Sequence, residues 1–365
     1  GKRVIAVGGA GFVGSNLCRK LLETDVAEIL VIDNLLSAER ENIPESKRIV
    51  FWENSVADDA VLNKIDDEYD YIFHLATYHG NQSSIHDPIA DHDNNLVTTL
   101  KLFNRVKDYK NLKKVVFSGA GCAVAEKTFE DAKPTSEDAP VSFEMDSPYS
   151  ISKIVGEFYA LYFHRQHQLP TVRARFQNVY GPGEVLGAGK WRGTPATVWR
   201  NVTPTFIYKA LKQESLPLEN EGMATRDFIF VDDIVNGLML CAEKGRPGEV
   251  YNLANGTETR IKDLAGLINR FTENPTPATI KPKRDWDRSG CRFGSTQKAQ
   301  IALGFTADVD LVEGLHKTIE WTQINLEFVE KMISKHKNQL DNLNSQSGRF
   351  PADKNYPSKS IRSKL

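Results

Sequence analysis

The 365-residue chain has few cysteines, no long apolar run and almost no net charge, and each absence excludes a class of protein. Its four cysteines are scattered without the spacing of a metal site or a redox pair, so we expect no bound metal and a reducing, cytoplasmic setting. No apolar run approaches the roughly 18–20 residues of a membrane span, which predicts no membrane insertion. A net charge of −2 provides no basic field that would attract nucleic acid.

A glycine-rich turn follows the first apolar run, residues 4–7, and precedes a predicted helix. Gly8 permits a tight turn, Gly11 lets the backbone approach a pyrophosphate, and Gly14 lets helix and strand pack closely. The start of the helix offers unpaired N–H groups to the anion. A second apolar run ends in Asp33, about 20 residues after the glycines. This order predicts a dinucleotide-binding site, and the alternative is a glycine-rich turn in another α/β protein.

Strands and helices alternate through the first half of the chain. Such alternation predicts an α/β fold with a Rossmann-type, doubly wound parallel sheet, helices on both faces and ligands at the carboxyl ends of the strands. The predicted strands span residues 4–7, 29–33, 49–52, 71–76, 115–118 and 171–176, and the predicted helices span residues 12–22, 95–106 and 150–164.

The second half is less regular, with loop-rich stretches between predicted helices. We predict an NAD-binding Rossmann domain at residues 1–180, to which some later segments return, and a smaller substrate-binding lobe formed mainly by residues 181–333. Residues 334–365 carry seven Lys or Arg against two Asp and few apolar groups, which predicts a basic, solvated and flexible tail. The alternative for this tail is a docking segment. The predicted helices of this half span residues 204–212, 232–243, 261–272 and 311–330.

Tyr149 and Lys153 stand four residues apart at the start of a predicted helix, which places both side chains on one face. An ammonium beside a phenol stabilises the phenolate, so we expect the pKa of Tyr149 to fall from about 10 towards neutrality. A tyrosine tuned in this way can take a proton from a sugar hydroxyl during its oxidation by a nicotinamide. The alternative is a pair on the helix surface.

The chain resembles the nucleotide-sugar epimerases and dehydratases of the extended short-chain dehydrogenase/reductase family, from about residue 3 to residue 330. The resemblance implies tightly held NAD, a nucleoside-diphosphate sugar as substrate and transient oxidation to a 4-keto sugar. It also implies a homodimer joined by a four-helix bundle, to which each subunit contributes helices 95–106 and 150–164. The motifs that carry the resemblance are residues 8–14, 31–35, 73–76, 149–153, 175–182 and 226–233.

The same resemblance assigns residues to cofactor and substrate. Asp33 corresponds to the acid that holds the adenosine ribose, and its charge disfavours a 2′-phosphate, so NAD is expected rather than NADP. For the substrate, Asn178 is expected at the sugar and Asn201 at the phosphates. Arg226 and Arg284 are expected to clamp the diphosphate, and surface salt bridges are their alternative. The remaining cofactor residues implied are Gly8, Gly11, Phe12, Val13, Gly14, Asn34, Leu75, Ala76, Asn95, Ser118, Tyr149 and Lys153.

Two positions depart from the family pattern. An acid that contacts adenine is replaced by Asn54-Ser55, which should alter adenine contacts without abolishing NAD binding. The family also places a Ser or Thr hydroxyl at Ala120, where alanine cannot hydrogen-bond. Ser118, Cys122 or a water could substitute, because residues 118, 120 and 122 share one side if the segment stays extended.

Cys122 stands near the position where the family's dehydratases carry an Asp-Glu pair, which argues against dehydration. A cysteine at this offset is similar to that of GDP-mannose 3,5-epimerases and GDP-fucose synthases, where the thiol moves a proton at carbon. A 4-keto group acidifies the hydrogens at C3 and C5, and inversion there needs a second proton donor, for which Lys190 is the candidate. His79 or His86 could contact the sugar. The alternative for Cys122 is a residue that fills space near the cofactor.

These residues predict an NAD-dependent nucleotide-sugar epimerase with two open routes. The keto intermediate rotates and is reduced from its other face, which inverts C4, or Cys122 exchanges a proton at C5 or C3 before reduction. Ala120 motivates a rival reading as a catalytically weak nucleotide-sugar sensor. Another modifying enzyme of the family, a dehydratase or a reductase, is the remaining alternative, and Asp33 disfavours external NADPH. The nucleobase, the sugar and the inverted carbon stay open.

Overall fold

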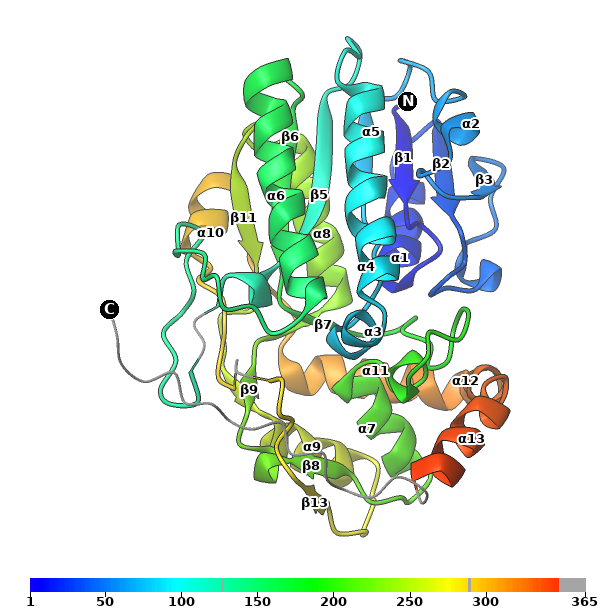
Figure 1. The fold of residues 1–365 in the computed structure, drawn as a ribbon, viewed down its shortest axis with the longest axis vertical. Coiled ribbons are helices and arrows are strands. Elements are labelled where there is room, and N and C mark those ends of the chain that lie inside the picture. Colours follow the sequence, from blue (N-terminus) through cyan, green and yellow to red (C-terminus); the bar gives the residue numbers. More distant parts are fainter. Residues whose placement is uncertain (126–127, 288–289, 348–365) are drawn as a thin grey trace.

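The computed structural model describes residues 1–125, 128–287 and 290–347. Figure 1 shows a sheet with its covering helices in one half of the molecule and a smaller lobe of helices and short strands below it. Within the described ranges, no helix combines the length and apolarity that crossing a membrane requires.

Seven parallel strands form the central sheet in the order β11-β6-β5-β4-β1-β2-β3. The chain enters at β1, moves outward through β2 and β3, and returns to the other side of β1 for β4, which confirms the predicted doubly wound fold. The strands are β1 (Arg3–Val7), β2 (Glu28–Asp33), β3 (Ile49–Glu53), β4 (Tyr71–His74), β5 (Lys114–Ala120), β6 (Thr171–Phe176) and β11 (Val250–Leu253).

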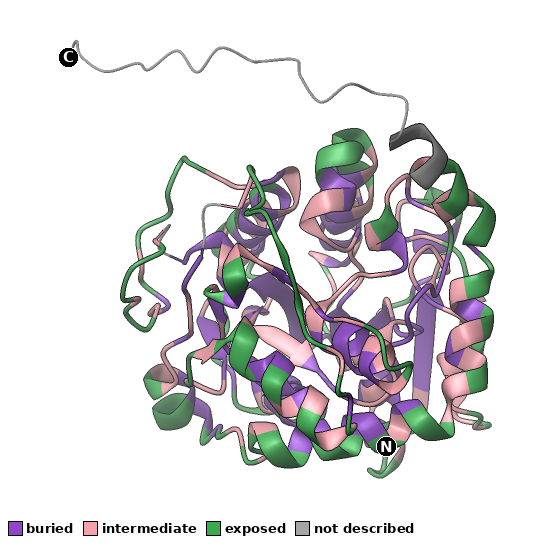
Figure 2. Cartoon of the chain, turned by 90° about the horizontal axis from the view of Figure 1, so that it is seen from below, coloured by how far each residue is buried: buried purple, intermediate pink, exposed green. Residues whose placement is uncertain are grey.

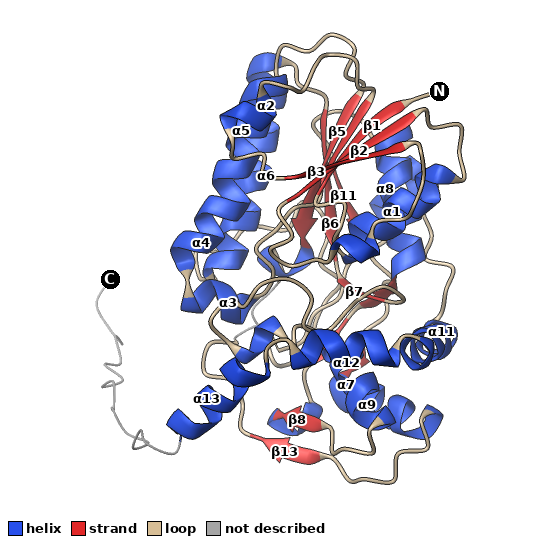
Figure 3. Cartoon of the chain, turned by 90° about the vertical axis from the view of Figure 1, so that its right-hand side faces the viewer, coloured by secondary structure: helices blue, strands red, loops and turns tan. Residues whose placement is uncertain are grey.

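Helices cover both faces of this sheet, as Figure 3 shows from the side. On one face, α1 (Phe12–Leu22) and α8 (Val231–Glu243) pack against alternate residues of β1, and on the other face α5 (Thr98–Val106) and α6 (Pro148–His167) pack against the rest. Buried colouring therefore predominates in the inner strands in Figure 2, whereas the edge strand β3 has no buried residue. Near-continuous apolar strands are the consequence of burial on both faces.

Helices in two regions differ from their predicted limits. The helix predicted at residues 95–106 is preceded by α4 (Pro88–His92) and a π-helical turn at Asp93–Val97, and only then continues as α5. The helix predicted at residues 311–330 divides into α11 (Leu311–Ile324) and α12 (Leu326–Ser334). Asn325 separates them with a ψ of 17°, which interrupts the helical backbone.

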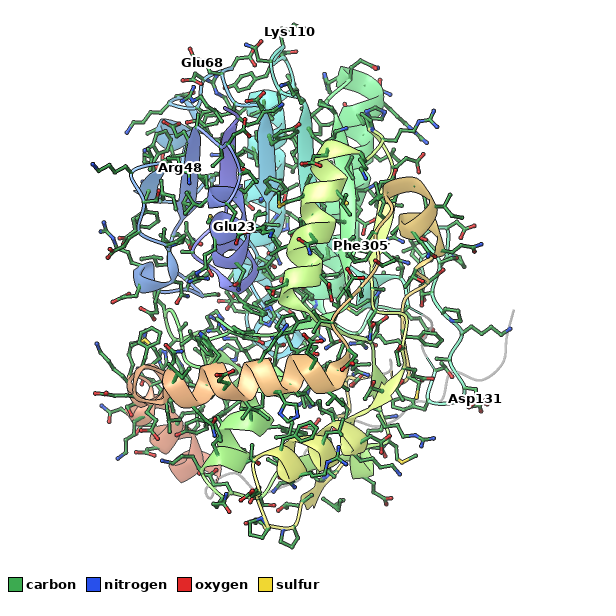
Figure 4. The ribbon with its side chains drawn as sticks, turned by 180° about the vertical axis from the view of Figure 1, so that it is seen from behind. Glu23, Arg48, Glu68, Lys110, Asp131 and Phe305 are labelled. Carbon is green, nitrogen blue, oxygen red and sulfur yellow. The ribbon has the colours of Figure 1, made fainter. Side chains whose placement is uncertain are left out.

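The smaller lobe has its own apolar core, which includes Phe206, Phe228 and Leu315. Its helices are α7 (Val202–Leu211), α9 (Ile261–Phe271) and α11. Figure 4 shows, on the opposite face of the molecule, Phe305 packed beside α8. The remaining elements are α2 (Asp59–Leu62), α3 (Asn81–His86), α10 (Gln297–Leu303), β7 (Asn178–Tyr180), β8 (Pro217–Glu219), β9 (Thr225–Arg226), β10 (Phe228–Phe230), β12 (Thr259–Arg260) and β13 (Thr279–Lys281), with short 3-10 turns at Arg40–Asn42, Gly121–Ala123, Pro195–Thr197 and Asn220–Gly222.

The first part of the segment expected to be a flexible tail is helical instead. Helix α13 (Lys337–Ser347) follows α12. His336, in the short connection between the two helices, is buried. His336 Nε2 donates to the carbonyl oxygen of Gly187 at 2.9 Å, and its ring lies against Trp191. One buried residue therefore anchors a stretch whose polar composition suggested no anchor. Residues 348–365 of the predicted tail lie outside the described residues.

Candidate active site

A cavity of about 680 Å³ opens at the carboxyl ends of the central strands and continues to the smaller lobe. Val7, Ile32 and Ser118 line it from the sheet, while Arg226 and Trp286 line it from the lobe. The cavity lies where β1 is flanked by β2 and β4, the point at which the strand order reverses. Ligands of open α/β sheets bind at this crevice, and the volume lies in the range of about 300–1,000 Å³ found for ligand sites.

The glycine turn at one end of the cavity accepts no side chains. Gly8 has a φ of +81°, and a Cβ there would lie 2.5 Å from the Ala76 nitrogen. A Cβ on Gly14 would lie 2.2 Å from the Gly8 carbonyl oxygen. Gly11 precedes α1, and no side chain caps the first turn of that helix. The first N–H groups of α1 are therefore not occupied by a capping side chain, and they are the donors that a dinucleotide pyrophosphate requires.

Asp33 and Asn34 lie at the end of β2, beside the glycine turn. Asp33 Oδ2 accepts from the Ala10 N–H at 3.0 Å and Oδ1 accepts from the Leu35 N–H at 2.9 Å. Burial raises the pKa of Asp33, and these backbone donors oppose the rise. The carboxyl group is thereby fixed beside the turn and lines the cavity, where ribose hydroxyls could donate to it. The residues present fit an NAD adenosine.

Tyr149 and Lys153 come from the first two turns of α6, and both line the cavity. Ser147 caps this helix, because its hydroxyl accepts from the Ser150 N–H at 3.3 Å. Lys153 Nζ lies 5.9 Å from the centroid of the Tyr149 ring and donates to the Ser118 carbonyl oxygen at 3.1 Å. The start of α6, with the Tyr149 phenol and the Lys153 ammonium, thus lies against the end of β5.

The expectation that the pKa of Tyr149 falls is wrong for the chain by itself. Burial raises the pKa of Tyr149, and the charges of Cys122 and Asp91 raise it further. Burial also lowers the pKa of Lys153 to about 8. Removal from water disfavours the charged form of each group, and burial is the largest cause of both shifts. The Thr77 hydroxyl beside the phenol acts in the opposite direction and lowers the pKa of Tyr149.

The segment around Ala120 does not stay extended, so the condition for residues 118, 120 and 122 to share one side is not met. Strand β5 ends at Ala120, and Gly121–Ala123 forms a 3-10 turn. Ser118 donates its hydroxyl hydrogen to the His74 carbonyl oxygen at 3.1 Å, so that hydroxyl is already engaged. Cys122 still lines the cavity, together with Ser118 and Ala120. The hydroxyl that lies beside Tyr149 is therefore that of Thr77, which the sequence did not single out.

His79, one of two histidines suggested for the sugar, lines the cavity, whereas His86 is exposed. The His79 ring centroid lies 6.5 Å from that of Tyr149, and its Nε2 lies 3.4 Å from Asn201 Oδ1. Burial and the nearby Arg200 lower the pKa of His79 to about 3, so its ring is uncharged at neutral pH. A neutral imidazole thus stands beside the phenol.

The four residues expected at the substrate all line the cavity: Asn178, Asn201, Arg226 and Arg284. Arg226 also donates to the Gly290 carbonyl oxygen at 2.8 Å and pairs with Asp287 at 3.3 Å. Arg284 pairs with Glu219, with both side chains about two-fifths exposed. Both arginines form ion pairs and also line the cavity. Forming a salt bridge therefore does not exclude either arginine from contact with a ligand.

The comparisons with known proteins identify the family of this chain. The family model for the NAD dependent epimerase/dehydratase family matches residues 4–254. The chain belongs to that family. NAD is therefore its cofactor, and the resemblance inferred from the sequence is confirmed.

The chain matches its relatives over nearly their full length. The UDP-glucose 4-epimerase of Mycolicibacterium smegmatis is 30% identical, with 87% of this chain and 98% of the relative matched. The dTDP-glucose 4,6-dehydratase of Streptomyces antibioticus is 28% identical, with 88% and 92% matched. The Bordetella bronchiseptica enzyme WbmF, solved with NAD⁺ and UDP, is 60% identical with a TM-score of 0.84 and covers 93% of this chain and 98% of its own. Epimerases and dehydratases are thus both among them.

Two residues assigned by the resemblance lie away from the cavity wall. Asn95 is buried behind it, where Oδ1 accepts from the Tyr78 N–H at 2.7 Å and Nδ2 donates to Asp91 at 2.8 Å. It supports the loop that carries Thr77 and His79 rather than touching the cavity. Lys190 is exposed, and its N–H donates to the Leu36 carbonyl oxygen at 2.9 Å. Lys190 does not line the cavity, so the structure does not place it as the second proton donor.

Glu184, Trp199 and Arg200 also line the cavity, and sequence reasoning missed all three. Glu184 follows the Gly-Pro-Gly turn at residues 181–183, and Arg200 directly precedes Asn201. Their only signal was this adjacency to motif residues. The described part of the chain contains no group of three or more His, Cys, Asp or Glu placed to bind a metal.

Proposed function

We propose that this chain is an NAD-dependent epimerase of a UDP-linked sugar, acting through a transient 4-keto intermediate. The observation that carries the proposal is the grouping of Tyr149, Lys153, Cys122 and His79 around one cavity that also contains the glycine turn. UDP is chosen because WbmF was solved with NAD⁺ and UDP, and the Thermotoga maritima UDP-glucose 4-epimerase, 30% identical with a TM-score of 0.79, was solved with UDP-glucose. Arg226 and Arg284 hold the diphosphate.

Tyr149 acts first, as the base for the C4 hydroxyl. When bound, NAD⁺ supplies reversible oxidation of that alcohol and adds a positive charge to the site. The added charge offsets the burial that raises the pKa of Tyr149. Thr77 supports the phenolate once its hydroxyl hydrogen turns to the phenol oxygen from Asn95 Oδ1, to which it donates at 3.1 Å. Lys153 positions the end of β5 through its bond to Ser118 and supplies the second positive charge. Tyr149 returns the proton when the ketone is reduced.

The keto sugar then exchanges a proton at the carbon next to the carbonyl. His79 removes the hydrogen of C3 or C5 as a proton, and the electron pair of that C–H bond delocalises onto the ketone oxygen as an enolate. This step requires the negative charge of the bound diphosphate to offset the burial and the Arg200 charge that lower the pKa of His79. The Cys122 thiol donates a proton to the opposite face of the same carbon. The imidazolium and the thiolate are reset by proton exchange through solvent, so no atom or electron is gained or lost. His79 replaces Lys190 in this role.

Inversion at C4 is the second candidate, and two observations favour it. Tyr149 and Lys153 suffice for it, and two relatives bear the name UDP-glucose 4-epimerase. The intermediate would rotate and be reduced from its other face, with no proton exchanged at carbon. Cys122 and His79 would then line the cavity without transferring a proton.

Turnover of UDP-, GDP- and dTDP-sugars in deuterated water tests the proposal. Deuterium at C3 or C5 of the product, detected by NMR and mass spectrometry, supports exchange by His79 and Cys122. A C4-inverted product without deuterium contradicts it and favours the second candidate. Loss of water from the sugar would indicate a dehydratase, and binding without any product would indicate a sensor. Cys122→Ser should lower deuterium uptake roughly 100-fold while C4 oxidation stays measurable.

We also propose that two subunits pair through α5 and α6, as the resemblance implies. Ile151, Phe158 and Tyr162 of α6 are about half exposed although large and apolar, and Ile89 of α4 is 69% exposed. The spacing of the three α6 residues places them on one face of the helix, and Figure 1 shows α5 and α6 side by side on the near face of the sheet. Sedimentation of Phe158→Glu, compared with the unmodified chain, should show the loss of a dimer.

A further inference from the structure

Two hydrogen bonds join Glu184, Asn201 and His79 in the cavity wall. Asn201 Nδ2 donates to Glu184 Oε1, and Asn201 Oδ1 lies 3.4 Å from His79 Nε2. Glu184 comes from the loop after β7, Asn201 precedes α7, and His79 lies in the loop after β4. Three segments far apart in the chain therefore meet in one line that ends at the ring beside Tyr149.

The side chain of Asn201 is turned away from its usual local role. It stands at the N-cap of α7, where asparagine commonly accepts from an N–H of the first turn. Here no side-chain capping bond forms, although the backbone of Asn201 has the extended conformation of a cap. The amide is instead directed at Glu184 and His79. This leaves a backbone donor of α7 without its usual partner, which indicates that the cavity contacts determine the orientation.

The orientation of the amide follows from which atoms can donate. The carboxyl Oε1 of Glu184 accepts, so it fixes the NH₂ group of Asn201 on its own side. The carbonyl oxygen of the amide then faces His79, and this oxygen can only accept. His79 Nε2 must therefore carry a hydrogen. Because the ring is neutral, Nδ1 holds the lone pair, and no described residue forms a hydrogen bond with it.

We propose that Glu184 is a positioning residue that, through Asn201, holds His79 in the Nε2–H tautomer and leaves Nδ1 as the atom that accepts the proton from the sugar. The use of that lone pair rests on the proposed function, whereas the tautomer does not. Glu184 touches neither the reacting carbon nor His79 directly. Its role is to select which ring nitrogen is basic, as carboxylates behind a histidine do at metal sites.

The surroundings of Glu184 fit this role better than a purely structural one. Glu184 is 5% exposed, and its Oε2 has no hydrogen-bond partner among the described residues. Burial raises its pKa to about 7, with Asn201 and Arg200 opposing the rise. A proton on the acid can reside on Oε2, which keeps Oε1 as the acceptor for Asn201 in both protonation states. A buried acid with an unpartnered oxygen lowers stability, so a purely structural role does not account for Glu184.

The tautomer of His79 can be measured directly on the NAD-bound protein. Long-range ¹H–¹⁵N correlation spectra distinguish a protonated ring nitrogen from an unprotonated one, and His79→Gln identifies the signals. We expect a single Nε2–H tautomer. In Glu184→Gln the new amide can either donate or accept, so both orientations of Asn201 become possible and the spectrum should show a mixture. Deuterium exchange at the sugar carbon should fall roughly 10-fold or more in kcat with little change in KM.

Two further variants keep the test decisive. Glu219→Gln removes another glutamate of the cavity wall, one that is half exposed and pairs with Arg284, and should leave the His79 spectrum unchanged. Asn201→Leu breaks the link while Glu184 stays, so it should reproduce the mixture even if Glu184→Gln does not fold. A Nδ1–H tautomer in the unmodified protein, or an unchanged spectrum in both Glu184→Gln and Asn201→Leu, overturns the proposal. A selected tautomer without any deuterium exchange contradicts the proposed function alone.

Discussion

The two ends of the cavity are built in different ways. At the cofactor end, Gly8, Gly11 and Asp33 lie within one strand-turn-helix-strand unit, and much of the surface is backbone. At the sugar end, His79, Cys122 and the loop of residues 184–201 come from separate connections. A local motif can therefore specify the cofactor, whereas the reaction depends on side chains that the fold alone brings together. The same fold hosts epimerases and dehydratases for this reason.

The largest expected effect separates chemistry from cofactor binding. Tyr149→Phe removes the hydroxyl that accepts the sugar proton, so kcat should fall roughly 1,000-fold, while NAD affinity, measured by fluorescence titration, stays within a few-fold. Tyr162→Phe on the same helix is the matched control, because Tyr162 lies outside the cavity wall and the variant keeps the ring proposed for the dimer contact, so kcat should stay unchanged. Substantial activity in Tyr149→Phe would show that the phenol is not the base.

The pH dependence of stability tests the sugar end without any substrate. Burial raises the pKa of Glu184 to about 7 from 4.5, so the folded chain binds more protons than the unfolded chain between these values. The stabilising contribution is fully present below pH 4.5 and is lost as the pH rises through 7. As the pH rises from 5 to 8, the unfolding free energy of Glu184→Gln should therefore increase relative to that of the unmodified chain by up to about 3 kcal/mol.

Urea unfolding at both pH values measures this difference. Glu219→Gln, at a half-exposed acid of the same wall, serves as the control and should show no comparable gain. Equal pH dependence in Glu184→Gln and the unmodified chain would mean that Glu184 is hydrated rather than buried.

A smaller effect tests the cofactor end. Gly8→Ala places a Cβ 2.5 Å from the Ala76 nitrogen in a left-handed backbone conformation, so it should lose about 1–3 kcal/mol of unfolding free energy and weaken NAD binding. Gly266→Ala in α9 is the control, because a Cβ there meets no atom within 4 Å. In that helix interior alanine should stabilise by about 0.5–1 kcal/mol. Thermal unfolding with and without NAD compares them, and a neutral Gly8→Ala would contradict the close fit of the turn.

The smallest effect concerns Lys190, which the resemblance suggested as a proton donor. Because it is exposed and outside the cavity wall, Lys190→Ala should change kcat less than about 2-fold. His79→Gln, measured in parallel, should abolish deuterium exchange at carbon. A large loss in Lys190→Ala would require its loop to move into the cavity and would restore the original assignment.

Several site expectations failed where an environment, not a residue type, decides the outcome. The pKa of Tyr149 was expected to fall because Lys153 is near, but the sequence contains no measure of the burial that opposes it. Residues 118, 120 and 122 would share one side only in an extended segment, but β5 ends at Ala120. Asn95 matched a family position, yet its side chain lies behind the cavity wall. Each outcome depends on how a side chain is buried or directed after packing.

The sequence by itself determined the Rossmann sheet, the glycine turn and the acid that follows it, because strand periodicity, glycine conformation and a fixed spacing act over a few residues. Apolar strands buried on both faces require helices on both sides of the sheet. Only the tertiary structure decided that Glu184, Asn201 and His79 meet, that Thr77 stands beside Tyr149, and that Lys190 points to solvent. These contacts join loops distant in the chain, and no local propensity encodes the distance between two loops.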